Sequence, residues 1–261
     1  MQKPGAFVKL SALATIVFLQ LPVPIVVLAA LNTTSYLKIP PDGLTLEWFS
    51  QILIDPQYLS AIQLSVILAM GSTIMSLLMG VPAAYALYKG RLPVSGAISS
   101  FLMGPLIFPA IVIGVAQLQY FALVGLRGSL LVLLVSHVVI TVPFIVRSAL
   151  TSLSGMDPMV EDAARALGAT PFETFRLVTL PMIKPGLVAG CIFSIVVSLD
   201  NVPVTIFLLK PGDMTLSVLI FTSVEQGVDP RVAAVSTLLI IVTGLLLLLA
   251  EKWSGFHRFV G

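Results

Sequence analysis

Charged side chains are scarce in this sequence of 261 residues, since Asp, Glu, Lys and Arg make up only 10% of it. Soluble domains carry about 25% charged residues, so this chain cannot cover a surface that faces water. Cysteine and histidine are also rare, with one Cys and two His, which excludes an intrachain disulfide, a thiolate metal cluster and a histidine-rich metal site. The net charge of +2 is too small to indicate a nucleic-acid partner. Hydrophobic residues make up 57% of the chain, which predicts an integral protein of the lipid bilayer.

Sequence motifs for ATP binding and for common hydrolytic chemistry are absent. No G-x-x-x-x-G-K-[ST] phosphate-binding loop, G-x-S-x-G nucleophile elbow or H-E-x-x-H metal pair occurs. We therefore expect no catalytic residue, no resident metal and no cofactor in this chain. The energy source for any active process must be another subunit.

Apolar stretches predict an all-α, polytopic membrane protein with six transmembrane helices in one domain over residues 1–261. A helix rises 1.5 Å per residue, so roughly 20 apolar residues cross a hydrocarbon core of about 30 Å. The third stretch carries Pro93, Pro105 and Pro109 in its first part, which places its crossing later. The first stretch is expected to be a retained helix rather than a signal peptide. The expected spans are about 10–31, 61–88, 97–121, 128–150, 186–209 and 231–250.

The distribution of Lys and Arg between the loops predicts the orientation of the helices. Ten of the 14 basic residues fall on the side that holds both chain termini, and four fall on the other side. Cytoplasmic loops carry an excess of Lys and Arg, so both termini are expected in the cytoplasm. The external segments are too short for a folded domain of their own. Anything recognised outside must be delivered by another protein or met directly in the membrane.

One cytoplasmic loop, residues 153–185, is rich in signals that start and stop helices. Asp157 is a preferred N-cap residue, and the proline after it suits the first position of a helix. Thr170 with Glu173 forms a capping box at a second helix start. Gly168 stands between the two short helices as a C-terminal glycine. The loop is expected either to dock on a partner or to rest as an amphipathic hairpin on lipid headgroups. Local geometry alone leaves both interpretations open.

Within this loop, the run Asp162-Ala-Ala-Arg-Ala-Leu-Gly168 is followed, after nine residues, by Val178-Thr-Leu-Pro181. This spacing resembles the cytoplasmic signature of binding-protein-dependent ABC importer permeases of type I. The family more often has Glu at the position of Asp162, and here Glu161 stands beside it. The order of six spans, with this loop between the fourth and the fifth, is similar to the family over nearly the whole chain.

The resemblance implies that the loop carries a coupling helix that docks on a separate ATPase subunit. Small residues would admit close approach, Phe172 and Phe175 would anchor the contact, and Asp162 or Glu161 would pair with a basic residue of the partner. It also implies a second permease subunit in a heterodimer, two ATP-binding subunits, an extracytoplasmic substrate-binding protein and a bacterial inner membrane location. The expected coupling residues are Glu161, Asp162, Ala163, Ala164, Gly168, Phe172, Phe175, Leu180 and Pro181.

Asp200 is the one acidic residue inside an expected span. A carboxylate near the bilayer centre costs about 2.5–3.5 kcal/mol on insertion scales, and such residues usually line a polar path. We expect a translocation path formed by Ser198, Asp200, Asn201 and Thr205. The alternative is a gate residue that bonds a neighbouring helix and touches no cargo. His137, on the fourth span, is expected to bond across helices rather than to carry protons.

The stretch from Ser198 to Phe207 resembles the fifth span in the second permease component of the spermidine/putrescine branch. Leu199 replaces an aromatic residue of that pattern, and Asn201 replaces a second acid. The resemblance implies a polyamine or a similar small organic cation as cargo. An amino-acid derivative, an opine, a phosphonate or ferric ion remains open, as does a secondary transporter or channel. An intramembrane aspartyl protease would need a second carboxylate beside Asp200.

Overall fold

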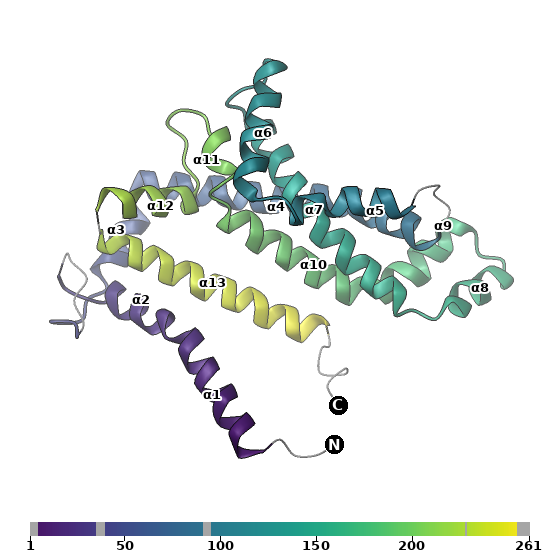
Figure 1. Ribbon diagram of the computed structural model, residues 1–261, viewed down its shortest axis with the longest axis horizontal. Coiled ribbons are helices and arrows are strands. Elements are labelled where there is room, and N and C mark those ends of the chain that lie inside the picture. Colours follow the sequence, from purple (N-terminus) through teal and green to yellow (C-terminus); the bar gives the residue numbers. More distant parts are fainter. Residues whose placement is uncertain (1–4, 35–39, 91–94, 228, 255–261) are drawn as a thin grey trace. The chain divides into compact units, whose positions relative to one another are not determined.

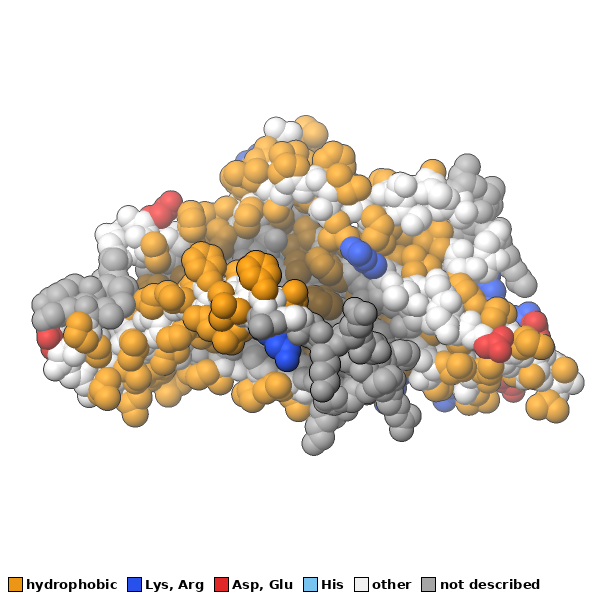
Figure 2. Space-filling model, turned by 60° about the horizontal axis from the view of Figure 1, so that its bottom comes forward, with side chains coloured by type: hydrophobic (Ala, Val, Ile, Leu, Met, Phe, Trp, Pro, Cys, Tyr) orange, Lys and Arg blue, Asp and Glu red, His pale blue; other side chains and the backbone are white. Residues whose placement is uncertain are grey.

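The computed structural model describes residues 5–34, 40–90, 95–227 and 229–254, and its regular structure is helical within these ranges (Figure 1). The chain divides into two compact units. Unit 1 comprises residues 1–59 and 219–244, and unit 2 comprises residues 60–218 and 245–261. Hydrophobic side chains are spread widely over the face seen in Figure 2, and far fewer charged side chains are visible there.

Five helices in the described residues are long and apolar enough to cross a membrane. A sixth candidate is a bent pair, Ser95–Leu106 and Ala110–Leu123, whose two parts meet at 101°. This bend falls inside the third expected span, 97–121. The bend falls between Pro105 and Pro109, because a proline removes a helical hydrogen bond and crowds the preceding turn. The five continuous spans are Phe7–Ala30, Pro56–Tyr88, Leu130–Ser154, Pro171–Asp200 and Pro230–Leu249.

Unit 1 holds the N-terminal helices and most of the last one. The indole nitrogen of Trp48 donates a 2.7 Å hydrogen bond to the carbonyl of Asn32. Arg231 lies 3.0 Å from Asp55 and 2.6 Å from Asp229, which ties the starts of two spans together. The elements are α1 (Ala6–Gln20), α2 (Pro22–Ala30), α3 (Glu47–Ile54), the start of α4 (Pro56–Tyr88), the end of α12 (Leu216–Gln226) and most of α13 (Pro230–Ser254).

Unit 2 contains both candidate sites. Its elements, besides the remaining parts of α4, α12 and α13, are α5 (Ser95–Met103), the 3-10 helix η1 (Gly104–Leu106), α6 (Ala110–Leu123), α7 (Leu130–Ser154), α8 (Pro158–Ala166), α9 (Pro171–Thr174), the π-helix η2 (Phe175–Thr179), α10 (Leu180–Asp200) and α11 (Thr205–Leu208). Helices α7 and α10 run side by side (Figure 1).

Close packing of α4, α7 and α10 depends on small residues. A Cβ added at Gly190 on α10 would lie 3.0 Å from the Cβ of Ser148 on α7. A Cβ at Gly80 on α4 would lie 3.0 Å from Cγ2 of Ile145. Small residues let helix backbones approach in a membrane, where van der Waals contact drives association. One buried hydrophobic core among these three helices consists of Val81, Ala84, Ile145, Val146, Ala149, Leu153, Ile183 and Leu187.

Candidate functional site

The two short helices of the loop at residues 153–185 begin with the predicted caps. The carboxylate of Asp157 accepts a 2.9 Å hydrogen bond from the backbone N–H of Met159. At the second start, the Thr170 hydroxyl accepts from the N–H of Glu173 (3.3 Å), and the Glu173 carboxylate accepts from the N–H of Thr170 (2.8 Å). These bonds satisfy backbone donors that a helix start leaves free, so the chain begins a helix at each point.

Gly168 ends α8 in the way the sequence predicts. Its φ of +94° lies in the left-handed region, which side-chain-bearing residues rarely adopt. The Gly168 N–H donates to the carbonyl of Arg165 (2.9 Å), and the Ala169 N–H donates to the carbonyl of Ala164 (3.1 Å). This pair of bonds is a Schellman motif, which closes the helix and reverses the chain toward α9.

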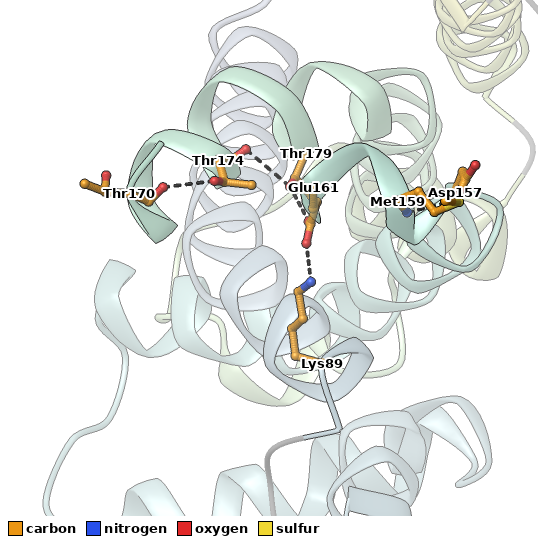
Figure 3. Close-up of polar contacts among 7 residues, drawn as sticks. All are labelled: Lys89, Asp157, Met159, Glu161, Thr170, Thr174 and Thr179. Atoms are coloured by element: carbon orange, nitrogen blue, oxygen red, sulfur yellow. Dashed lines mark hydrogen bonds and ion pairs between the residues drawn. The ribbon is translucent and has the colours of Figure 1, made fainter. Parts of the chain in front are cut away.

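The carboxylate of Glu161 fixes α8 to the end of α4 (Figure 3). Glu161 is 1% exposed and forms an ion pair with Lys89, which follows directly after α4. Its other oxygen accepts a 2.5 Å hydrogen bond from the Thr179 hydroxyl, at the start of α10. One buried carboxylate therefore joins the coupling loop to two spans. Glu161 faces inward, so of the two neighbouring acids only the exposed Asp162 is left for a basic residue of a partner.

The protonation state of Glu161 suits this role. Burial raises the pKa of the carboxyl, but hydrogen bonds from Lys89 and Thr179 and the positive charges of Lys89 and Arg165 lower it further, so it lies below its usual range. The carboxylate is therefore ionised at neutral pH. A lowered pKa in the folded protein means that this stabilisation is present above the ordinary carboxyl pKa and is lost only as the pH falls through the lower value.

Phe175 also faces inward. Its ring centroid lies 4.9 Å from that of Tyr85 on α4, and Lys89 lies 5.5 Å from the Tyr85 centroid. The half-buried ring of Phe175 therefore packs within the chain, and its expected role as an anchor for a partner stays a prediction. The sequence lacked this information, since Tyr85 lies 90 residues before Phe175 and no local spacing links them.

Several of the remaining expected coupling residues are exposed, and together with exposed neighbours in the loop we call them the docking face. Leu167 is 90% exposed and Phe172 is 70% exposed, at the two sides of the exposed Gly168. Large apolar side chains exposed together mark an interaction site more often than a solvated surface. The docking face consists of Met159, Asp162, Ala163, Leu167, Gly168, Phe172 and Leu177, with Ala164 half-buried at its edge.

The second short helix does not end at Leu180 and Pro181, although a proline is a common helix-stop signal. The π-helix η2 leads directly into α10, so one helix runs from Pro171 to Asp200. Leu180 packs against the core, and Pro181 lies in the first turn of α10. A π-helical turn changes the hydrogen-bond pattern locally, which lets the helix pass a proline that lacks an N–H.

Removing the Lys89 side chain is expected to loosen the coupling loop. In Lys89→Ala the buried Glu161 carboxylate would lose its counter-charge, a change that costs about 3–5 kcal/mol in buried pairs. The double variant Lys89→Ala/Glu161→Gln should recover much of the loss, because the glutamine oxygen still accepts from Thr179. The measurement is the rate of tryptic cleavage after Arg165 in the detergent-purified protein.

Lys184→Ala is the control for this prediction, since Lys184 is an exposed lysine on the first turns of α10. It should leave cleavage after Arg165 at the rate of the unaltered protein. Equal cleavage rates in Lys89→Ala and Lys184→Ala would mean that the ion pair does not anchor the loop.

The second candidate site is a break in the fifth span. Helix α10 ends at Asp200, Asn201 is extended with φ −76° and ψ 100°, and α11 begins only at Thr205. The expected span over 186–209 is therefore interrupted between α10 and α11, because Pro203 supplies no N–H and Asn201 caps a new start. The Asn201 side-chain oxygen accepts a 2.9 Å hydrogen bond from the N–H of Val204.

The four expected path residues separate into two pairs. Asp200 is exposed and Asn201 is half-exposed, and within the described part of the chain Asp200 has no ion-pair partner. Ser198 and Thr205 are buried and point to α7, so they line no open path within this chain. Although Asn201 and Thr205 are four positions apart, they do not share a helix face, because the helix is broken between them.

The expectation that His137 bonds across helices is confirmed. Its Nδ1 lies 2.7 Å from the Ser198 hydroxyl, and its Nε2 lies 3.1 Å from the Thr205 hydroxyl. The sequence showed a histidine on an apolar span but gave no sign of these two partners. They lie 61 and 68 residues further along the chain.

The comparisons with known proteins agree with this architecture. The family described as "Binding-protein-dependent transport system inner membrane component" matches residues 11–254, and this chain belongs to that family. The spermidine/putrescine transport system permease protein PotC of Escherichia coli (strain K12) is 31% identical over 235 residues, which cover 90% of this chain and 88% of the relative. The putrescine transport system permease protein PotI of the same strain is 30% identical over 235 residues, 87% of this chain and 83% of the relative.

The fold is shared with solved ABC transporters. A chain from a bacterial ABC transporter involved in the import of the acidic polysaccharide alginate superposes with a TM-score of 0.71 at 15% identity, over 97% of this chain and 99% of that one. The predicted all-α permease fold is therefore confirmed. The protein is a multi-pass permease subunit of a binding-protein-dependent importer of the inner membrane, and its relatives are transport permeases rather than enzymes.

Proposed function

We propose that this chain forms half of the translocation path of an ATP-driven importer for polyamines or similar small organic cations. The position of Asp200 is the observation that supports a cationic cargo. Its exposed carboxylate stands at the last residue of α10, and a helix C-terminus is itself the negative end of the helix dipole. Broken helices in transporters present such ends to cargo and ions. A carboxylate on a negative helix end favours a cation.

The depth of the break supports a role in the path. The Ser72 hydroxyl, midway along α4, lies 3.4 Å from the Ser198 hydroxyl, two residues before Asp200. If α4 crosses the membrane about its centre, Asp200 lies close to the middle of the bilayer. A charge at that depth is costly unless it faces water, cargo or another subunit. The relatives named for spermidine and putrescine transport agree with a cationic cargo.

The docking face supports coupling to a separate ATP-hydrolysing subunit. Its apolar side chains are exposed although the loop itself is fixed to α4 and α10 through Glu161. A rigidly held apolar surface loses little entropy on binding. We propose that two ATPase subunits bind below the permease pair, and that their closure moves α8 and α9 and opens the path outward. The excess of Lys and Arg on one side supports a cytoplasmic position for this loop and both chain termini.

Six helices supply half a pathway, so a second permease chain completes it, as a heterodimer. A soluble binding protein delivers the cargo from outside. By linkage, docking of the loaded binding protein must in turn change the state of the ATPases.

Uptake measurements test this proposal. The complete importer in right-side-out vesicles, with its binding protein added outside, should take up radiolabelled putrescine only when ATP is supplied inside, on the cytoplasmic side. Unlabelled spermidine should compete, and 2-aminoethylphosphonate and ferric ion should not. Uptake of an anion alone would overturn the cationic cargo. Uptake driven by an ion gradient without ATP would overturn the coupling to an ATPase.

A further inference from the structure

His137 is the side chain in the described ranges whose hydrogen bonds reach both sides of the break in the fifth span. It is 1% exposed, on α7, and its two ring nitrogens point to Ser198 in the last turn of α10 and to Thr205, the first residue of α11. Asp200 and Asn201 lie between these two contacts. The ring therefore spans the segment that carries the exposed carboxylate.

The directions of the surrounding hydrogen bonds can be assigned. The Thr205 hydroxyl donates to the backbone carbonyl of Asn201, so its oxygen accepts from Nε2–H of His137. In the neutral ring Nδ1 then accepts from the Ser198 hydroxyl, which also lies 3.4 Å from the Ser72 hydroxyl on α4. One unidirectional series of bonds thus runs from Ser198 on α10 through His137 on α7 to the carbonyl at the break.

The neighbouring pairs of hydroxyl groups do not bond to both sides of the break. Thr73 and Ser194 lie 2.8 Å apart and join α4 to α10 before the break. Ser76 and Thr141 lie 2.8 Å apart and join α4 to α7. Both pairs are as buried as His137, so they provide helix–helix contacts of the same kind. Neither touches α11, so neither fixes the distance between the two sides of the break.

We propose that His137 is a positioning residue that holds Asp200 and Asn201 in place by bonding the helix on each side of them. The inference rests on the proposed function, in which Asp200 faces the cargo. With both bonds present, the end of α10 and the start of α11 move together with α7. With one bond lost, the segment between them gains freedom and the carboxylate is less often in the position that binds cargo.

Two near-isosteric variants each remove one bond. Ser198→Ala removes the partner of Nδ1, and Thr205→Val removes the partner of Nε2 while keeping the branched shape. In uptake assays with the complete importer, each should raise the KM for putrescine about 3- to 10-fold, the effect of one lost hydrogen bond. Co-purification of the other subunits should be unchanged. Thr205→Ser keeps the hydroxyl and should restore the KM, and Ser194→Ala, a buried serine one turn earlier, should leave it unchanged.

A second readout needs no cargo. Cys191 is the only cysteine in the sequence, so Cys191→Ser with Val202→Cys gives one thiol inside the break. Its labelling rate by a charged methanethiosulfonate reagent should change at least threefold when Ser198→Ala or Thr205→Val is added, and not when Ser194→Ala is added. Unchanged labelling in both variants overturns the positioning role, whatever the cargo. Changed labelling without any putrescine uptake retains the positioning role and rejects the proposed cargo. If Ser194→Ala raised the KM as much as Thr205→Val does, the effect would reflect general helix packing, and the positioning role of His137 would be rejected.

Discussion

Replacing Gly168 by aspartate is expected to separate this chain from its ATPase subunit and to reduce uptake more than tenfold. Any side chain at a φ of +94° is strained, by about 1–2 kcal/mol. Space is not the obstacle, because a Cβ at Gly168 would meet no atom within 4 Å. The new carboxylate would instead lie among the exposed apolar side chains of the docking face, where an unpaired charge would have to be desolvated on binding. Co-purification of the ATPase with the tagged permease measures the effect.

Gly212 offers a closely matched control for this variant. Its φ is +92°, and a Cβ there would also meet no atom within 4 Å, but it lies in the loop between α11 and α12. Gly212→Asp therefore carries the same backbone strain and the same new charge away from the docking face. It should leave ATPase co-purification unchanged, and Gly168→Ala should show the part of the loss that is due to strain alone. Full ATPase retention and normal uptake in Gly168→Asp would reject the docking role of the loop.

Asp200→Asn is expected to reduce uptake roughly 10- to 100-fold while the complex still assembles. The substitution keeps the size of the side chain and removes its negative charge, and a charge-assisted contact to a cation is worth about 1.5–3 kcal/mol. Asp200 is exposed within this chain and has no ion-pair partner among the described residues, so no internal contact is lost. Initial rates of putrescine uptake at several concentrations measure the loss, with subunit co-purification in parallel.

Two further variants separate charge from position. Asp213→Asn removes an exposed carboxylate from the loop after α11 and should leave the uptake rate unchanged. Asp200→Glu keeps the charge and should retain more uptake than Asp200→Asn. Unchanged transport kinetics in Asp200→Asn would favour the alternative, in which Asp200 is a gate residue that contacts no cargo.

The features that follow from neighbouring residues were predictable from the sequence. Three such features are the N-cap at Asp157, the capping box at Thr170 and Glu173, and the left-handed glycine at 168. In each of them, the residues that bond to one another lie within five positions in the sequence. Backbone donors at a helix start must find a nearby acceptor, so the residue types in the loop determine where its helices begin and end. The apolar spans could also be predicted from the sequence, because their length is set by the thickness of the bilayer.

The features that depend on distant residues were not predictable. Glu161 and Asp162 are both acidic neighbours, and only the ion pair with Lys89, 72 residues earlier, decides that Glu161 is buried and Asp162 is exposed. The same holds for Phe175 and its contact with Tyr85. The segments Leu180-Pro181 and Asn201 to Pro203 each contain a proline, which by itself indicates a break in a helix. The first is absorbed by a π-helical turn and the second is a true break, and the difference lies in the packing around them.

The uninterrupted helix from Pro171 to Asp200 has a mechanical consequence. Its first turn lies beside Gly168, at the surface proposed to meet the ATPase, and its last residue is the carboxylate proposed to meet the cargo. At 1.5 Å per residue these two ends are about 45 Å apart, joined by one continuous helix. A tilt or axial rotation imposed at the nucleotide-hydrolysing end would be transmitted along that helix to Asp200, with no relay through other spans.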